Sequence, residues 1–363
     1  MELWTVMPSS PQLVVQRAKE YEAAGLAGMV VWDAQSSDGD CYVSLAAAAM
    51  ATTTLKLGTG VTNPVTRHPA VTASAIASLQ AISNGRAVLG IGRGDASLAH
   101  IGRAPASVET LSRYTQLVQK YLSGDSIAFD DLAEFATNAP NLSQLDLGHT
   151  PPHSKLEWLG DMPKVPVEVS ATGPRMIADA AIHADGVMLS VGADLERLRW
   201  GIDLVRSTRA KAGLDPSGIP VGAWVNVVAH PDIQIARQLA SGWTSVFARF
   251  AIMHGKPTGP QTDESIKSLE HLYNDFDLRD QASSSSSQAQ GMSQDFIDTY
   301  AIVGSADTCV DRLRQISELG ISKVIAVGFA ETTSSTNGRY ATEAFLYQIA
   351  PALKIRPSFF RPS

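Results

Sequence analysis

The sequence has few cysteines, no surplus of positive charge and no long hydrophobic run. Its two cysteines, Cys41 and Cys309, are too few for a disulfide scaffold or for a metal cluster of their own. Acidic side chains outnumber basic ones by 36 to 29, for a formal net charge of −7. Nucleic acids and anionic membrane surfaces are therefore not expected partners. We interpret both cysteines as core thiols of a protein from a reducing compartment.

Membrane and targeting signals are also missing. The longest apolar stretch, around Ala46 to Met50, is too short to span a bilayer. Met1 to Met7 alternates like a strand and lacks the apolar core of a signal peptide. With 44% hydrophobic and 18% charged residues, the chain has the composition of a globular protein with a large core. These features predict a cytoplasmic protein.

Short β-branched runs alternate with segments of helical period. In the first such segment, Val14, Ala18 and Tyr21 share one face after a Ser10 cap. Strict alternation indicates a parallel sheet, and eight units favour a closed barrel over an open doubly wound sheet. We predict an α/β fold, a (β/α)8 TIM barrel, in a single domain spanning 1–363. The predicted strands are Leu3–Met7, Met29–Trp32, Leu55–Val61, Ala87–Ile91, Val165–Ser170, Val187–Ser190, Val221–Val228 and Val324–Val327.

Two segments interrupt the alternation. We interpret about 127–164 as an irregular insertion before the fifth strand and about 255–300 as a second one before the eighth. The second contains the serine run Ser283–Ser287, which is typical of a solvated loop without a packing role. Barrel enzymes place such excursions near the carboxyl ends of the strands, so we expect both insertions near the ligand.

Candidate ligand residues follow the second and third predicted strands. Asp33 comes directly after an apolar strand, where it either contacts a ligand or caps the next turn. Gly58 and Gly60 fall inside the next strand. They indicate close backbone approach by a ligand, a bulge or a barrel kink.

The fourth and fifth predicted strands end in two further motifs. Gly90, Gly92 and Gly94 lack the spacing of a dinucleotide fingerprint, and no helix is predicted directly after them, so a flat ring against the backbone is favoured. The second motif, Thr172 to Arg175, runs into a helix starting near Pro174. Its free amides, hydroxyl and cation suit a phosphate, although an ordinary capped helix is the alternative.

These motifs carry a resemblance. LGTGVTNPVTRHPAVTA from Leu57 to Ala73, NGRAVLGIGRGD from Asn84 to Asp95 and FARFAIMHG from Phe247 to Gly255 resemble the bacterial luciferase-like oxidoreductases. The similarity is strongest to the branch that uses coenzyme F(420), an 8-hydroxy-5-deazaflavin, and includes methylenetetrahydromethanopterin reductase. The resemblance implies a non-prolyl cis peptide at Gly60–Val61. It also implies cofactor contacts from Asp33, Gly60, Val61, Thr62, Asn63, Gly92, Arg93, Gly94, Ala171, Thr172, Gly173, Pro174 and Arg175.

The catalytic residues are less clear because the chain departs from its relatives. Ala34 stands where the related dehydrogenases have a histidine after the acid, which disfavours sugar-phosphate oxidation. Asp95 matches a glutamate, and we expect it to donate or relay a proton, with turn capping as the alternative. His254 ends an apolar helical face and is a candidate substrate contact. No metal site is predicted.

The resemblance implies an enzyme that transfers a hydride between the deazaflavin of coenzyme F(420) and a C=O, C=N or C=C bond of a small organic molecule. Two alternatives remain open. One is a monooxygenase that uses flavin mononucleotide (FMN), and the other is a flavin-binding protein without turnover. Relatives of this kind commonly pair through barrel helices, so we expect a homodimer.

Overall fold

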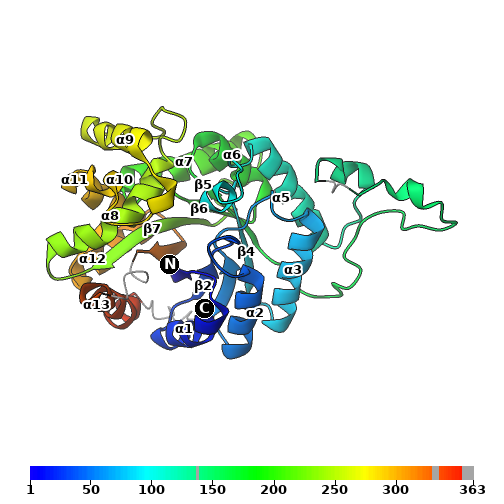
Figure 1. The fold of residues 1–363 in the computed structure, drawn as a ribbon, viewed down its shortest axis with the longest axis horizontal. Helices are drawn as coiled ribbons and strands as arrows, with labels where there is room; N and C mark the ends of the chain where they lie inside the picture. The colour runs from blue at the N-terminus through cyan, green and yellow to red at the C-terminus, as the bar shows by residue number, and fades with distance from the viewer. Residues whose placement is uncertain (136–138, 329–334, 354–363) are drawn as a thin grey trace, which may run out of the picture.

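Eight parallel strands close into a barrel, as predicted. The computed structural model describes residues 1–135, 139–328 and 335–353. The strands follow the order β6-β5-β4-β3-β2-β1-β9-β7, and β6 pairs with β7 to close the ring (Figure 1). These strands are β1 (Glu2–Met7), β2 (Gly28–Val31), β3 (Lys56–Thr59), β4 (Ala87–Ile91), β5 (Val167–Ala171), β6 (Gly186–Leu189), β7 (Val221–Ala229) and β9 (Lys323–Val327).

A further strand, β8 (Ala301–Gly304), was not predicted. It pairs in parallel with the second half of β7, from Asn226 to Ala229. The first half of β7 pairs with β9, so β7 extends beyond the barrel and β8 accompanies this extension. Four residues next to an irregular segment are too short to give a clear strand pattern.

Helices surround the barrel, and the first illustrates how local signals set their bounds. α1 begins at Pro11 after the Ser10 cap position and ends at Gly25, whose φ of 82° lies in the left-handed region. The main helices are α1 (Pro11–Ala24), α2 (Cys41–Ala51), α3 (Pro69–Ile82), α4 (Ala96–Ala99), α5 (Val108–Leu122), α6 (Pro174–His183), α7 (Leu195–Lys211), α8 (Ile233–Arg249), α9 (Asp263–Asp275), α10 (Ser287–Gln290), α11 (Gln294–Tyr300), α12 (Ala306–Glu318) and α13 (Thr336–Ala344). Shorter turns are Phe129–Phe135, Leu142–Leu145, Leu278–Asp280, Phe345–Ile349 and α14 (Ala350–Ala352).

Buried residues fill two regions, one between strands and helices and one inside the barrel. Both cysteines belong to the outer region as free buried thiols, which confirms that prediction. At the amino ends of β5 and β9 inside the barrel, Lys323 Nζ lies 2.6 and 2.5 Å from the two Glu168 carboxylate oxygens. The apolar interior consists of Trp4, Val6, Val30, Val88, Met188, Trp224, Ile325 and Val327.

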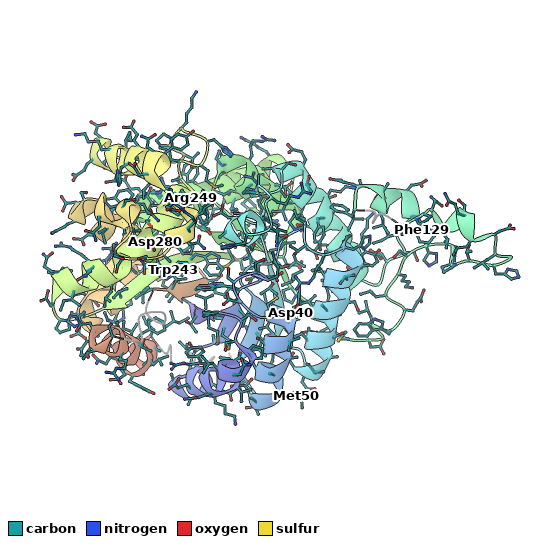
Figure 2. All side chains as sticks on the ribbon, viewed as in Figure 1. Asp40, Met50, Phe129, Trp243, Arg249 and Asp280 are labelled. Atoms are coloured by element: carbon teal, nitrogen blue, oxygen red, sulfur yellow. The ribbon has the colours of Figure 1, made fainter. Side chains whose placement is uncertain are left out.

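The first insertion does not lie near the carboxyl ends of the strands, contrary to expectation. It forms an arm that projects from the barrel beside α3 and α5 (Figure 1). Phe129, on this arm, lies far from Trp243 and Arg249 (Figure 2). The topology explains this, because a segment between a helix and the next strand ends at that strand's amino end. The arm therefore does not cover the carboxyl ends of the strands.

The second insertion is helical and packed, which corrects the prediction of an irregular loop. α9, α10 and α11 cluster beside α8 (Figure 1). The serine run is not solvated throughout, since Ser286 is buried and its hydroxyl donates to the Ser283 carbonyl at 2.8 Å. A Cβ atom on Gly242 of α8 would lie 2.0 Å from the Ala282 carbonyl oxygen. Only a glycine permits this close packing.

The helices of the described residues all fall short of a membrane span, either in length or in apolar character.

Candidate functional site

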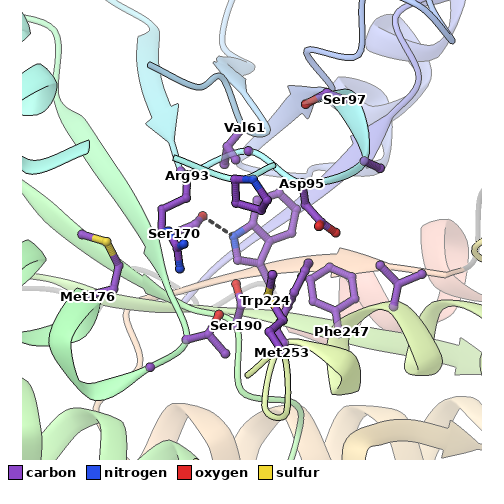
Figure 3. A pocket seen from close by; sticks show the side chains of 18 of the residues that line it. Val61, Arg93, Asp95, Ser97, Ser170, Met176, Ser190, Trp224, Phe247 and Met253 are labelled. Atoms are coloured by element: carbon purple, nitrogen blue, oxygen red, sulfur yellow. Dashed lines mark hydrogen bonds between the residues drawn. The ribbon is translucent and has the colours of Figure 1, made fainter. Parts of the chain in front are cut away.

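A pocket of about 660 Å³ opens at the carboxyl ends of the barrel strands. Trp224 of β7 and Ser170 of β5 form part of its floor, and the indole Nε1 donates to the Ser170 hydroxyl at 3.0 Å (Figure 3). Because side chains alternate along a strand, both residues point into the barrel. The floor of the pocket is thus the top of the barrel interior.

The glycines of β3 and β4 are explained by packing within the protein. A Cβ atom on Gly60 would lie 2.4 Å from Val30 Cγ2, and one on Gly90 would lie 2.2 Å from the Thr59 carbonyl oxygen. These positions need glycine whether or not a ligand binds. The reason is close packing against neighbouring barrel atoms, which differs from the ligand approach, the bulge and the kink that the sequence suggested. The Gly60–Val61 peptide is cis, as the resemblance implied. Both residues line the pocket.

Asp33 lines the pocket as an ion-paired carboxylate and does not cap a turn. Its Oδ2 accepts from the Thr62 hydroxyl at 2.6 Å and from Arg67 Nη1 at 2.5 Å. Arg67 also reaches Asp40 at 2.9 Å. Burial lowers the pKa of Arg67, but the negative charge of Asp33 outweighs it and raises that pKa overall. Arg67 therefore fixes the position of the Asp33 side chain in the pocket lining.

The start of α6 forms the end of the pocket expected to hold a phosphate. The N-cap residue of α6 is Gly173, and no side chain of the described residues caps this helix start. A Cβ atom on Gly173 would meet no described atom within 4 Å, so space is open in front of the free amides. Thr172, Pro174 and Arg175 line this space, and Arg175 forms an exposed salt bridge with Glu109.

Arg93 lies next to this region and is a second cation in the pocket lining. Its Nε donates to the Ala106 carbonyl at 2.5 Å, which fixes the plane of the guanidinium. Burial lowers the pKa of Arg93, with smaller effects from Glu109 and Arg175. The arrangement suits an anionic group bound between the starts of α5 and α6.

Asp95 also lines the pocket, and its carboxylate pairs with Arg249 of α8. It makes no capping bond to α4, although this short helix begins directly after it, where none was predicted. The Arg249 guanidinium stacks on the Phe276 ring of the second insertion at 4.5 Å. The Asp95 side chain is therefore fixed in the pocket lining by Arg249, which in turn packs on Phe276.

Two further polar residues stand at the pocket wall. His254 lines the pocket and is exposed at its rim, where it is placed to contact a substrate. Asp38 also lines the pocket but was missed, because a half-buried acid in a turn has no sequence signal. Burial raises the pKa of Asp38, and no cation among the described residues pairs with it.

Three residues of the expected cofactor set lie behind the pocket wall. Thr62 is buried and holds Asp33, as described above. Asn63 is buried, and its Oδ1 accepts from the backbone N–H groups of Val65 and Thr66 at 3.0 and 3.1 Å. Ala171 is buried within β5. Their side chains shape the wall and are not part of the pocket lining.

A set of aromatic side chains, which we call the aromatic wall, was also missed. It consists of Trp32, Trp224, Trp243, Phe247 and Phe250, all in the pocket lining. Trp243, Phe247 and Phe250 are spaced four and three residues apart, which places them on one face of α8. This spacing is visible in the sequence, so these three residues could have been recognised as one helix face.

Metal binding has no visible basis in the structure. Within the described residues, no group of three or more His, Cys, Asp or Glu side chains is arranged to hold a metal ion.

Comparisons with known proteins find relatives of this chain by sequence and by fold. The 5,10-methylenetetrahydromethanopterin reductase of Methanolobus tindarius is 27% identical over 334 residues, covering 88% of this chain and 91% of the relative. A coenzyme F(420)-dependent tetrahydromethanopterin reductase from Methanopyrus kandleri has the same fold, with a TM-score of 0.71 at 21% identity over 97% and 99% of the two chains. A coenzyme F(420)-dependent secondary alcohol dehydrogenase, solved with a coenzyme–acetone adduct, gives 0.69 at 16% identity over 98% and 99%. The family described as luciferase-like monooxygenase matches residues 3–323, and the chain therefore belongs to that family.

Proposed function

We propose that this protein is a coenzyme F(420)-dependent oxidoreductase that exchanges a hydride between the deazaflavin and a small organic molecule. The observation that carries the proposal is the open, uncapped start of α6 at one end of a large pocket, with Thr172 and Arg175 beside it. The similarity to coenzyme F(420)-dependent reductases supports this choice of cofactor.

The residues present fit such a cofactor. The free amides of α6, the Thr172 hydroxyl and the Arg175 cation suit its phosphate, and Arg93 adds positive charge nearby. Val61, next to the cis peptide, and the backbone of Gly92 and Gly94 provide a surface for a flat ring. When bound, the deazaflavin supplies the hydride donor or acceptor.

The remaining chemistry belongs to side chains of the pocket. The aromatic wall faces the interior of the pocket and excludes water from a bound substrate. Asp38, which has a raised pKa, is suited to donate the proton when a carbonyl is reduced and, by microscopic reversibility, to accept it back when an alcohol is oxidised. Asp95, paired with Arg249 in the same pocket lining, is the alternative proton relay. His254 orients the substrate at the rim.

The test is equilibrium binding of purified coenzyme F(420) to the Arg175→Met variant, measured by fluorescence quenching. Because a charge-assisted hydrogen bond to a phosphate is lost, we expect the affinity to fall about ten-fold or more. Arg199→Met, which removes an exposed arginine from α7, serves as the matched control and should bind like the wild type. Equal affinities in all three proteins would reject this phosphate site.

FMN is the alternative ligand because the matching family is described by monooxygenase activity. Its phosphate suits the same helix start. Tighter binding of FMN than of coenzyme F(420) would favour the monooxygenase. Binding of either ligand without a substrate-dependent change in its absorption spectrum would favour a flavin-binding protein without turnover.

A further inference from the structure

The rings of the aromatic wall lie next to one another and form one continuous surface. The ring centroids of Trp32 and Trp243 lie 5.1 Å apart, and those of Trp243 and Phe247 lie 6.1 Å apart. Phe247 stacks on Trp224 at 6.2 Å and meets Phe250 edge to face at 6.0 Å. These rings come from β7, from α8 and from the residue after β2, so the fold brings together three separate segments of the chain.

The wall lies apart from the end of the pocket suited to phosphate. Trp224 and Phe247 lie on one side of the close-up, and Arg93 and Met176 lie on the other (Figure 3). Arg175, at the start of α6, belongs to the phosphate end. A ligand whose phosphate binds at α6 and whose ring lies near Val61 and Trp224 leaves the remaining part of the wall, Trp243, Phe247 and Phe250, available to a second molecule.

The two carboxylates next to the aromatic wall are each paired with an arginine. Asp33, directly after Trp32, is paired with Arg67, and Asp95 is paired with Arg249, which precedes Phe250 in sequence. Lys256 and His254 are exposed at the rim of the pocket. A substrate with a charge on its buried part would lose its hydration without gaining an opposite charge beside the aromatic wall.

Resting on the function proposed above, we propose that the aromatic wall recognises a neutral, planar, apolar substrate, such as an aryl ketone. A flat aromatic ring can stack face to face on Trp243 or Phe247, whereas a dicarboxylate has no ring and the charge of a sugar phosphate finds no unpaired opposite charge among the described residues beside the wall. Stacking on protein aromatics adds to the burial of apolar area, and it distinguishes a planar ring from a saturated ring of similar size.

The test compares three ligands by isothermal titration calorimetry. 2-Acetylnaphthalene and its saturated counterpart 2-acetyldecahydronaphthalene carry the same methyl ketone on the same carbon skeleton and differ in ring planarity, and glucose 6-phosphate supplies the charged case. Each is titrated into protein saturated with coenzyme F(420) and into protein without it. We expect 2-acetylnaphthalene to bind coenzyme-saturated protein about ten-fold more tightly than 2-acetyldecahydronaphthalene, and glucose 6-phosphate to bind least.

Phe247→Leu removes one ring of the wall but keeps an apolar side chain. It should reduce the affinity for 2-acetylnaphthalene several-fold and leave that for 2-acetyldecahydronaphthalene nearly unchanged. Tyr347→Leu, which removes an exposed ring outside the pocket, is the matched control and should bind all three ligands like the wild type.

The outcomes separate this inference from the proposed function. Equal affinity for the two ketones, displacement of 2-acetylnaphthalene by the coenzyme, or no effect of Phe247→Leu would overturn the inference even if coenzyme F(420) binds. If the protein does not bind coenzyme F(420) but still prefers 2-acetylnaphthalene in a Phe247-dependent way, the inference stands and the proposed cofactor is wrong.

Discussion

The charged side chains of the pocket occur largely in pairs drawn from distant parts of the chain. Asp33 pairs with Arg67, and Asp95 pairs with Arg249, 154 positions away. Asp33 and Asp95 could be predicted as pocket residues because each follows a strand of a recognisable barrel. Their partners could not, because an ion pair over such a separation depends on tertiary packing. The expected role of Asp95 as proton donor or relay stays a prediction, and the structure adds that its carboxylate is already engaged by Arg249.

Asp38 provides the pH prediction. Burial raises its pKa, so its protonated form persists to higher pH than that of an ordinary aspartate. If Asp38 donates the proton during carbonyl reduction, kcat/KM should be high below its pKa and fall as the pH rises through it. We expect Asp38→Asn to reduce kcat/KM about a hundred-fold or more and to remove this limb of the pH profile.

The comparison for Asp38 is Asp95→Asn, which should keep the same limb because that limb reports the ionisation of Asp38. Steady-state rates of ketone reduction across the pH range provide the measurement. An unchanged pH profile in the Asp38→Asn variant would exclude Asp38 as the proton donor.

Glu109 competes with any anion for Arg175. Their salt bridge is exposed and screened by solvent, so its contribution is small. Glu109→Gln removes this competition and a nearby negative charge, and it should increase the affinity for coenzyme F(420) by up to about five-fold. Fluorescence titration measures the effect, with Glu318→Gln on α12 as a control of equal charge change. A loss of affinity would mean that Glu109 itself helps to bind the cofactor.

At the scale of elements, the regular units were predictable and the second insertion was not. Eight strands were found from β-branched runs, because buried parallel strands have a simple sequence pattern. α9 was missed although Thr262 caps it and Leu269 and Leu272 are buried at helical spacing. The serine run next to it favoured a solvated loop, but Gly242 allows α8 to pack directly against that segment.

Glu22 joins two elements and gives a stability prediction. Its carboxylate accepts from the backbone N–H groups of Thr53, Thr54 and Leu55 at 2.9, 2.6 and 3.0 Å, which ties α1 to the start of β3. Partial burial raises the pKa of Glu22, but these hydrogen bonds outweigh it and lower the pKa from 4.5 to about 2. The stabilisation is therefore complete above pH 4.5 and is lost as the pH falls towards 2.

Denaturant unfolding at a series of acidic pH values tests this link. The free energy of unfolding of the wild type should fall more steeply with decreasing pH than that of Glu22→Gln, which lacks the titrating group. Glu157→Gln, in the exposed arm, should follow the wild type. Parallel curves for wild type and Glu22→Gln would contradict this account of Glu22.

At the scale of the whole molecule, the buried ion pair that we expect to stabilise the fold and the pocket that we expect to bind ligands lie at opposite ends of the barrel. The buried Lys323–Glu168 pair lies at the amino ends of the strands, and Lys323 also lies 4.0 Å from the Trp4 ring centroid. The pocket lies at the carboxyl ends. The arm belongs to neither, since none of its described residues lines the pocket. Substitutions at the two ends should therefore have separable effects.

Lys323→Met tests this separation. Removing one partner leaves Glu168 without its counter-ion, and we expect the free energy of unfolding to fall by about 3–5 kcal/mol. Lys56→Met removes a lysine from an exposed pair with Glu2 and should cost about 0–1 kcal/mol. Both variants, while folded, should bind coenzyme F(420) within about two-fold of the wild type. A large loss of affinity in Lys323→Met would show that the two ends are coupled.

The measurement that tests the central claim most directly is anaerobic titration of the wild-type protein with coenzyme F(420) and, separately, with FMN. The affinities are followed by quenching of each ligand's fluorescence. The account predicts saturable binding of coenzyme F(420) at least ten-fold tighter than that of FMN, with competition between the two for one site. Tighter binding of FMN, or no saturable binding of coenzyme F(420), would contradict it.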